Sequence, residues 1–114
     1  MIRGVGIDVV DIERFRESIE RTPSLRERIF TQREAVLKIS SLAARFAAKE
    51  ALAKALNAKE IFNWQQAEVI NEESGRPVFI FSGALAERID GANVQLSISH
   101  DAGIASAIVI IEDL

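Results

Sequence analysis

The segment 104–111 near the end of the chain is apolar on both faces of a β-strand. Because alternate residues of a strand face opposite sides, its apolar side chains form two sets, Ile104, Ile108 and Ile110 on one face and Ala105, Ala107, Val109 and Ile111 on the other. A strand that is apolar on both faces needs cover on both sides. The few helices that 114 residues can supply are expected to cover one side. An apolar face that is left uncovered therefore indicates association between copies of the chain.

The remaining hydrophobic periodicity predicts an alternation of strand and helix clusters. Strands are expected at 2–10, 67–71, 77–81, 94–100 and 104–111, the last four as two hairpins. Helices are expected after Asp11, at 32–39, at 42–56 and from residue 82 or 83 to 89, with breaks at 22–24 and before Thr31. The spacing of Thr31 and Glu34 matches a capping box. Clustered strands and helices indicate an α+β domain with antiparallel strands packed on helices, and residues 1–114 are expected to form one domain.

Composition excludes several classes of protein. The chain has no cysteine, which excludes disulfides and thiolate metal sites and fits a reducing cytoplasm. The longest apolar stretch has eight residues, whereas a membrane helix needs about 20. The first residues lack a signal-peptide pattern, so we expect a cytoplasmic protein without a membrane partner. With an isoelectric point of 5.2 and no basic stripe interleaved with aromatic residues, a nucleic-acid partner is not expected.

Charge is distributed unevenly along the chain. Residues 1–54 carry 11 basic and 8 acidic side chains, a net charge of +3, and residues 55–114 carry 3 and 9, a net charge of −6. This asymmetry suggests a docking face for an acidic partner. The alternative is a chance scatter of solvated charges.

Asp8 lies at the end of the first predicted strand, on the same face as Gly4 and Gly6. It is either a turn or cap residue or an oxygen ligand for a hard cation. Mg²⁺ typically takes one or two protein carboxylates and completes its shell with waters and substrate phosphates. The small glycines are expected to let a bulky ligand approach Asp8.

The predicted helix 42–56 carries charged residues at four-residue spacing. Arg45 and Lys49 are neighbours of like charge, which is unfavourable unless an anion lies between them. Glu50 and Lys54 form the favourable pair. One interpretation is a solvated helix face with a salt bridge. The other assigns Arg45, Lys49 and Lys54 to phosphates and Glu50 to a metal.

His100 is the only histidine, and it ends the apolar face of its predicted strand. It is either a structural residue or a base. The sequence has no histidine cluster for zinc and no phosphate-binding Walker loop.

Three motifs in order carry a family resemblance. They are Gly6-Ile7-Asp8-Val9-Val10-Asp11-Ile12-Glu13-Arg14-Phe15, Arg45-Phe46-Ala47-Ala48-Lys49-Glu50-Ala51-Leu52-Ala53-Lys54 and Ser97-Ile98-Ser99-His100, with Asn71, Gly75 and Pro77 in the hairpin between the last two. With these motifs the sequence resembles the holo-(acyl-carrier-protein) synthases, the short class of 4′-phosphopantetheinyl transferases. The resemblance extends over residues 2–112.

This resemblance implies a transferase of fatty acid biosynthesis and lipid metabolism. It implies transfer of the phosphopantetheine arm of coenzyme A to a serine of apo acyl carrier protein, with adenosine 3′,5′-bisphosphate as the second product. It also implies Mg²⁺ held by Asp8 and Glu50, and a homotrimer with active sites at the subunit interfaces.

The resemblance also assigns roles to single residues. Lys49 and Lys54 are expected to contact phosphates, and Arg45 and His100 to contact the nucleotide end. Glu50 is the first candidate for the group that takes the serine proton, and His100 is the second. Arg14 corresponds to the position that docks on the acidic helix of the carrier protein.

The segment 57–61 departs from the family pattern. The family usually has a Gly-Thr-Gly turn there, and this chain reads Asn57-Ala58-Lys59-Glu60-Ile61. Glycine permits close backbone approaches that alanine does not. The question whether the backbone of this loop contacts coenzyme A therefore stays open. Two further hypotheses remain: an inactive homologue that binds carrier protein or nucleotide, and a non-enzymatic interaction domain for an acidic partner.

Overall fold

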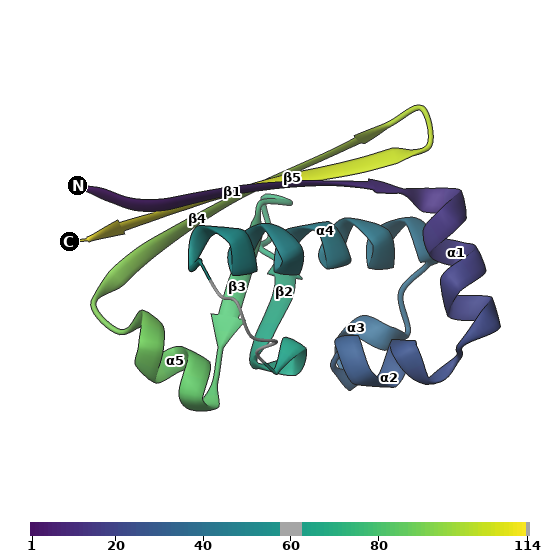
Figure 1. The fold of residues 1–114 in the computed structure, drawn as a ribbon, viewed down its shortest axis with the longest axis horizontal. Coiled ribbons are helices and arrows are strands. Elements are labelled where there is room, and N and C mark those ends of the chain that lie inside the picture. Colours follow the sequence, from purple (N-terminus) through teal and green to yellow (C-terminus); the bar gives the residue numbers. More distant parts are fainter. Residues whose placement is uncertain (58–62, 114) are drawn as a thin grey trace.

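Two antiparallel sheets and one long helix organise the chain (Figure 1). The computed structural model describes residues 1–57 and 63–113. In chain order the elements are β1 (Ile2–Asp11), α1 (Ile12–Arg21), α2 (Ser24–Ile29), α3 (Gln32–Ala35), α4 (Ile39–Ala55), the 3₁₀ helix η1 (Trp64–Gln66), β2 (Ala67–Asn71), β3 (Pro77–Phe81), α5 (Gly83–Ile89), β4 (Ala92–Asp101) and β5 (Ile104–Asp113). The prediction of an α+β fold is confirmed, as are the strands of both predicted hairpins.

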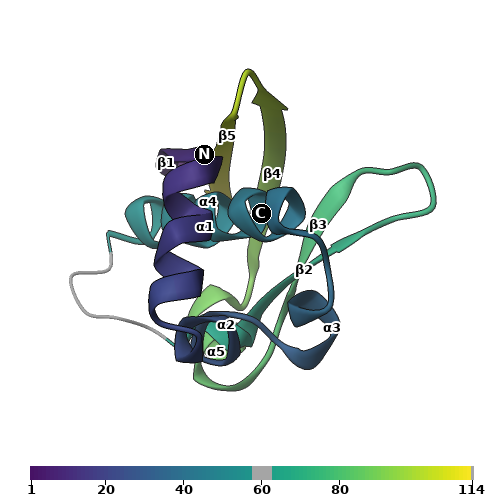
Figure 2. The ribbon, with the colours of Figure 1, turned by 90° about the vertical axis from the view of Figure 1, so that its right-hand side faces the viewer.

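The larger sheet has the strand order β1-β5-β4, with both neighbouring pairs antiparallel. β4 and β5 are joined by Ala102 and Gly103, whose φ angles are +51° and +78°. Positive φ at both central residues is the requirement of a two-residue hairpin turn that follows the twist of its strands. The smaller sheet pairs β2 with β3 and extends away from the helices as an arm (Figure 2).

One face of the larger sheet packs on α4, and the opposite face is open to solvent. Along β5, Ala105, Ala107, Val109 and Ile111 are buried. On the opposite face, Ile7 of β1 is 58% exposed and its cross-strand partner Ile108 is 38% exposed. Val5 and Val9 extend this exposed apolar row along β1. The two-faced pattern of segment 104–111 thus corresponds to a sheet with cover on one side, among the elements that the structure describes.

Helix α4 lies between this sheet and a second layer formed by the short helices and β2–β3 (Figure 1). A helix with contacts on several sides is apolar around most of its surface, and α4 buries nine residues, most of them alanine. The predicted helix 42–56 is therefore present but begins three residues earlier. No helix among residues 1–57 and 63–113 has the length and apolar content needed to cross a membrane.

The prediction of a helix over 32–39 was only partly correct. The capping box is present, with the Thr31 N–H donating to Glu34 Oε1 and the Glu34 N–H donating to Thr31 Oγ1. However, α3 ends at Ala35, and Lys38 is extended before α4. Leu37 packs on the core from this connection, which is why the apolar pattern continued past the helix end. The six-residue α2 was not predicted, since a helix this short gives little periodic signal.

Gly4 and Gly6 allow the backbone of α4 to approach β1 closely. A Cβ atom at Gly4 would lie 2.0 Å from the carbonyl oxygen of Ala55, and one at Gly6 would lie 1.8 Å from that of Ala51. The expectation that these glycines leave room for a ligand was therefore wrong, because the helix takes that space.

Gly6→Ala is expected to destabilise the fold by about 3 kcal/mol, since the added methyl group cannot fit without moving α4 away from β1. Gly103→Ala is the matched control. It has positive φ but nothing within 4 Å of the added atom, so it should cost only about 1 kcal/mol of backbone strain. Urea unfolding of the two variants measures the difference, and equal costs would contradict the close packing of α4 on β1.

Candidate active site

Asp8 and Glu50 line one small cavity between β1 and α4. The cavity has a volume of about 350 Å³. Asp8 lies on the helix side of β1, where its register partner on β5 is the buried Ala107. Glu50 precedes Ala51, the residue whose carbonyl faces Gly6. The close packing of α4 on β1 thus brings together two carboxylates that are 42 positions apart in the sequence.

The two carboxylates influence each other electrostatically. Burial and the neighbouring charge of Asp8 raise the pKa of Glu50 above its ordinary value, and the positive charge of Lys54 opposes this shift. Two oxygen ligands of this type suit a hard divalent cation such as Mg²⁺. Among the described residues, no third histidine, cysteine, aspartate or glutamate joins them to form a complete metal site. A cation here needs oxygen ligands from its substrate as well.

Lys54 lies directly beside the carboxylates. Its Nζ atom donates to Asp8 Oδ1 at 3.1 Å and to the carbonyl oxygen of Ile7 at 2.9 Å. Its side chain remains 55% exposed, so the ammonium group is accessible to an anion that enters the site. The structure brings Lys54 and Glu50 close to Asp8, and the roles expected of them, phosphate contact for Lys54 and metal binding for Glu50, stay predictions.

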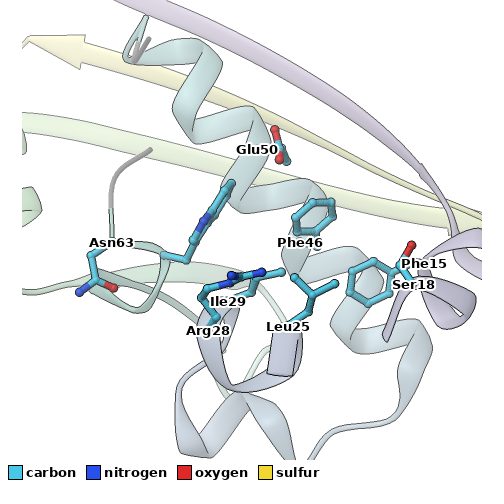
Figure 3. A pocket seen from close by; sticks show the side chains of 9 residues that line it. Phe15, Ser18, Leu25, Arg28, Ile29, Phe46, Glu50 and Asn63 are labelled. Atoms are coloured by element: carbon cyan, nitrogen blue, oxygen red, sulfur yellow. The ribbon is translucent and has the colours of Figure 1, made fainter. Parts of the chain in front are cut away.

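A larger, mostly apolar cavity of about 800 Å³ adjoins the carboxylate cavity. The two share Phe15, Ser18, Phe46 and Glu50 as lining residues. Figure 3 shows Glu50 and Phe46 projecting from α4, with Leu25 and Ile29 opposite them on α2. This cavity could not be predicted from the sequence pattern, because α2 was not predicted. The apolar pair Leu25 and Ile29, four residues apart, was the one signal for it.

Lys49 is not placed to contact a substrate phosphate, and that prediction is corrected. Its side chain is fully buried. Its Nζ atom donates to the carbonyl oxygens of Ile29 and Trp64, each at 3.0 Å, and to Glu34 Oε1 at 2.7 Å. These three bonds use all three donors of the ammonium group. Although burial lowers the pKa of Lys49, the negative charge of Glu34 opposes this shift.

The anion required by the Arg45 and Lys49 spacing is supplied by the protein itself. Glu34 is buried, and its charge acts on both basic groups. Its second oxygen, Oε2, accepts a hydrogen bond of 2.9 Å from the backbone N–H of Val69. The like-charge spacing of Arg45 and Lys49 is thus explained by the buried carboxylate of Glu34 rather than by a bound phosphate.

Arg45 and His100 line a separate cavity of about 240 Å³. It lies at the β4 edge of the larger sheet, across from Asp8 on β1, since Ile98 of this cavity and Asp8 are both register partners of Ala107. Its lining consists of Ser41, Ala44, Arg45, Asn71, Gly75, Pro77, Ile98 and His100. Arg45 donates to the carbonyl oxygen of Val69 and to Asn71 Oδ1, both at 3.2 Å. None of these eight residues lines the carboxylate cavity. Within one chain, the three sequence motifs are therefore divided between two places.

Arg14 is exposed on α1, where the N–H of its own backbone is capped by Asp11 Oδ1 at 3.0 Å. It lines the rim of the carboxylate cavity together with Asp8. This position is compatible with a docking role close to the reacting groups. The open question about the loop 57–61 falls, beyond Asn57, on residues outside those that the structure describes.

The raised pKa of Glu50 gives a pH dependence of stability with a defined sign. Since the folded-state pKa lies above the ordinary value of 4.5, the folded protein holds this proton more tightly than the unfolded chain does. The associated stability is present below pH 4.5 and is lost as the pH rises through the raised pKa. Without divalent metal, Glu50→Gln should therefore become progressively more stable than wild type over this window. Denaturant midpoints at several pH values test this, and a difference that is constant with pH would contradict it.

Comparisons with known proteins agree on one family. The model of the 4′-phosphopantetheinyl transferase superfamily matches residues 4–105. A holo-(acyl-carrier-protein) synthase of Streptomyces griseus is 54% identical over 121 residues, covering 98% of this chain and 99% of the relative. The crystal structure of the corresponding synthase from Neisseria meningitidis has a TM-score of 0.90 at 30% identity, covering 99% and 100% of the two chains. That of Helicobacter pylori, in complex with coenzyme A, has a TM-score of 0.85 at 32% identity, covering 95% and 99%.

Proposed function

The chain belongs to the 4′-phosphopantetheinyl transferase superfamily, and we propose that it transfers the 4′-phosphopantetheine moiety of coenzyme A to a serine of apo acyl carrier protein. The observation that carries this proposal is the cavity shared by Asp8 and Glu50, in a chain similar over nearly its full length to holo-(acyl-carrier-protein) synthases. Both carboxylates are present, so no observation favours an inactive homologue. The absence of cysteine fits action in a reducing cytoplasm.

In this reaction the serine oxygen attacks the β-phosphorus of coenzyme A. The bond from that phosphorus to the bridging oxygen breaks, and adenosine 3′,5′-bisphosphate leaves with the bonding electron pair. Glu50 is the group we assign to accept the serine proton, because its carboxylate lines both the cavity that it shares with Asp8 and the adjoining apolar cavity, and a base has to lie within reach of the proton that it takes. His100, the second candidate, lines the other cavity of the same chain.

We propose Mg²⁺ as the cofactor, held by Asp8 and Glu50 together with the pyrophosphate of coenzyme A. The donor set fits, because two protein carboxylates plus phosphate oxygens are the usual ligands of this ion. When bound, Mg²⁺ neutralises negative charge on the pyrophosphate. Lys54, whose Nζ atom is 3.1 Å from Asp8 Oδ1, would contact the same phosphates.

We further propose that the active enzyme is a homotrimer with its sites at the subunit interfaces. Two observations support this: the exposed apolar row along β1 and β5, and the division of the motif residues between two cavities. Arg45 and His100 of one subunit would then bind the nucleotide end of a coenzyme A whose pyrophosphate lies at Asp8 and Glu50 of its neighbour.

The direct test combines the protein with Mg²⁺, coenzyme A and an apo acyl carrier protein. A mass gain of one phosphopantetheine on the carrier, dependent on the metal and absent when the carrier serine is replaced by alanine, is expected. A carrier of unchanged mass would reject the transferase. Thermal stabilisation by coenzyme A that requires the metal would separately distinguish a coenzyme A site from an interaction domain that binds only an acidic protein.

Arg14 is expected to recognise the carrier protein rather than coenzyme A. Arg14→Ala should raise the apparent KM for the carrier at least about 5-fold and leave the KM for coenzyme A almost unchanged, because loss of a rim charge mainly slows association. Arg14→Glu should have the larger effect, and the rate should depend less on salt. If Arg14→Glu weakens coenzyme A instead, the residue belongs to the nucleotide site.

A further inference from the structure

Lys49 joins three separate segments to the central helix. Its ammonium group, on α4, donates to the last residue of α2, to the buried carboxylate of α3 and to the first residue of η1. The partners are Ile29, Glu34 and Trp64. Glu34 in turn accepts hydrogen bonds from the backbone N–H groups of Thr31 and Val69. One buried cation thereby fixes the relative positions of α2, α3, η1 and β2.

Two of these partners form walls of the apolar cavity beside Glu50. Ile29 and Trp64 both line it, and the backbone carbonyl oxygens of both accept hydrogen bonds from Lys49 Nζ. The ring of Trp64 also packs against Phe46, another lining residue. The lysine nitrogen thus ties together the two backbones that carry these cavity walls. Lys49 also directly precedes Glu50 in the sequence. The ammonium group that binds the cavity walls and the carboxylate that lines the cavity therefore come from the same turn of α4.

The donors of Lys49 explain its presence better than the charge of its ion pair does. A buried ion pair contributes little net stability compared with apolar side chains of similar volume. However, an apolar side chain would supply no donor to the carbonyl oxygens of Ile29 and Trp64, and unpaired buried carbonyls carry a cost. The three acceptors converge on one point, and the lysine ammonium group supplies three donors from a single atom.

We propose that Lys49, through its pair with Glu34, is a positioning residue that sets the width of the apolar cavity and thereby the space next to the Glu50 carboxylate. This inference rests on the proposed function for its kinetic consequence, but its structural consequence is independent of activity. Because the proposed function assigns the nucleotide end of coenzyme A to Arg45 and His100 at the other cavity, the substrate part in this space would be one that does not carry the nucleotide. Loss of Lys49 should therefore affect turnover more than the binding of coenzyme A.

The test uses the double variant Lys49→Met/Glu34→Gln, which removes both buried charges and avoids leaving one unpaired. Lys38→Met, at an exposed lysine before α4, is the matched control. Trp64 is the only tryptophan, so its fluorescence reports on the cavity wall without any substrate. In the double variant we expect acrylamide quenching of Trp64 to increase at least about 2-fold, kcat to fall at least about 10-fold and the KM for coenzyme A to change less than 2-fold. The control should match wild type in all three.

Each outcome decides the question. All measurements are made at a temperature where circular dichroism shows the variant to be folded. If the double variant does not fold, Lys49→Arg and Glu34→Asp, which keep the charges but shift the donors, should show the same split between kcat and KM. A folded variant with unchanged Trp64 quenching overturns the proposal, whatever its activity. A wild-type protein without transferase activity would reject the proposed function but leave the Trp64 result to decide the role of Lys49.

Discussion

Replacement of Asp8 by Asn, or of Glu50 by Gln, is expected to lower turnover at saturating Mg²⁺ by about 100-fold or more without unfolding the protein. Each substitution keeps the shape of the side chain and removes one carboxylate, a proposed metal ligand, from the cavity between β1 and α4. Without this ligand, bound Mg²⁺ would no longer neutralise the charge on the transferred phosphoryl group. Glu50→Gln also removes the proposed acceptor for the serine proton. Steady-state transfer to apo carrier protein measures the effect.

The control for this pair is Glu73→Gln, which removes an exposed carboxylate from the β2–β3 turn and should leave turnover unchanged. The affinity for Mg²⁺ in the presence of coenzyme A provides a second measurement. It should weaken in both site variants. Near-wild-type activity of either variant would show that the residue concerned is not a metal ligand.

Ile108→Asp is expected to convert the assembly to monomers and to reduce activity at least about 10-fold. Ile108 lies in the middle of the exposed apolar row, opposite Ile7. A carboxylate there costs little in a monomer, where the position faces water, but it would have to be desolvated in an interface. Monomers would hold the Asp8 cavity and the Arg45 cavity apart, so each site would lack its nucleotide-binding half.

Ile80→Asp is the matched control, because Ile80 of β3 is 46% exposed, much like Ile108 at 38%, but belongs to the other sheet. Light scattering at micromolar concentration gives the mass of each variant and of wild type. A fully active monomer would mean that one chain contains the whole site. A trimer that persists in Ile108→Asp would place the interface elsewhere.

The sequence was sufficient to predict the fold class and most elements. Alternating apolar residues located both hairpins, and the capping box at Thr31 and Glu34 located the start of α3. The end of α3 and the whole of α2 escaped prediction for a common reason. Both lie in a segment of short elements that is held by tertiary contacts, the hydrogen bond from Lys49 to Ile29 and the packing of Leu37 on the core, and such contacts leave only a weak local pattern.

The sequence motifs predicted which residue types form the site, but not that these residues are divided between two cavities. The motifs identified Asp8, Glu50 and Lys54, which the structure brings together. They did not distinguish Lys49 from Lys54, because burial depends on which side of α4 faces the second layer. Nor did they indicate that Arg45 and His100 lie at a different cavity. Arg45 and Glu50 are five residues apart on one helix, yet they line different cavities because α4 has contacts on several sides.

The contact between Gly6 and the carbonyl oxygen of Ala51 also determines how this site can evolve. Gly6 precedes Asp8 by two residues, and Ala51 follows Glu50. The close packing of the β1 backbone on the α4 backbone at this point therefore sets the distance between the chain segments that carry the two carboxylates. Substitutions elsewhere in the core can alter stability over many generations while this spacing stays constant. Selection for a different cation would have to act on the carboxylates themselves or on the glycine, and at the glycine every available side chain is larger than the gap allows.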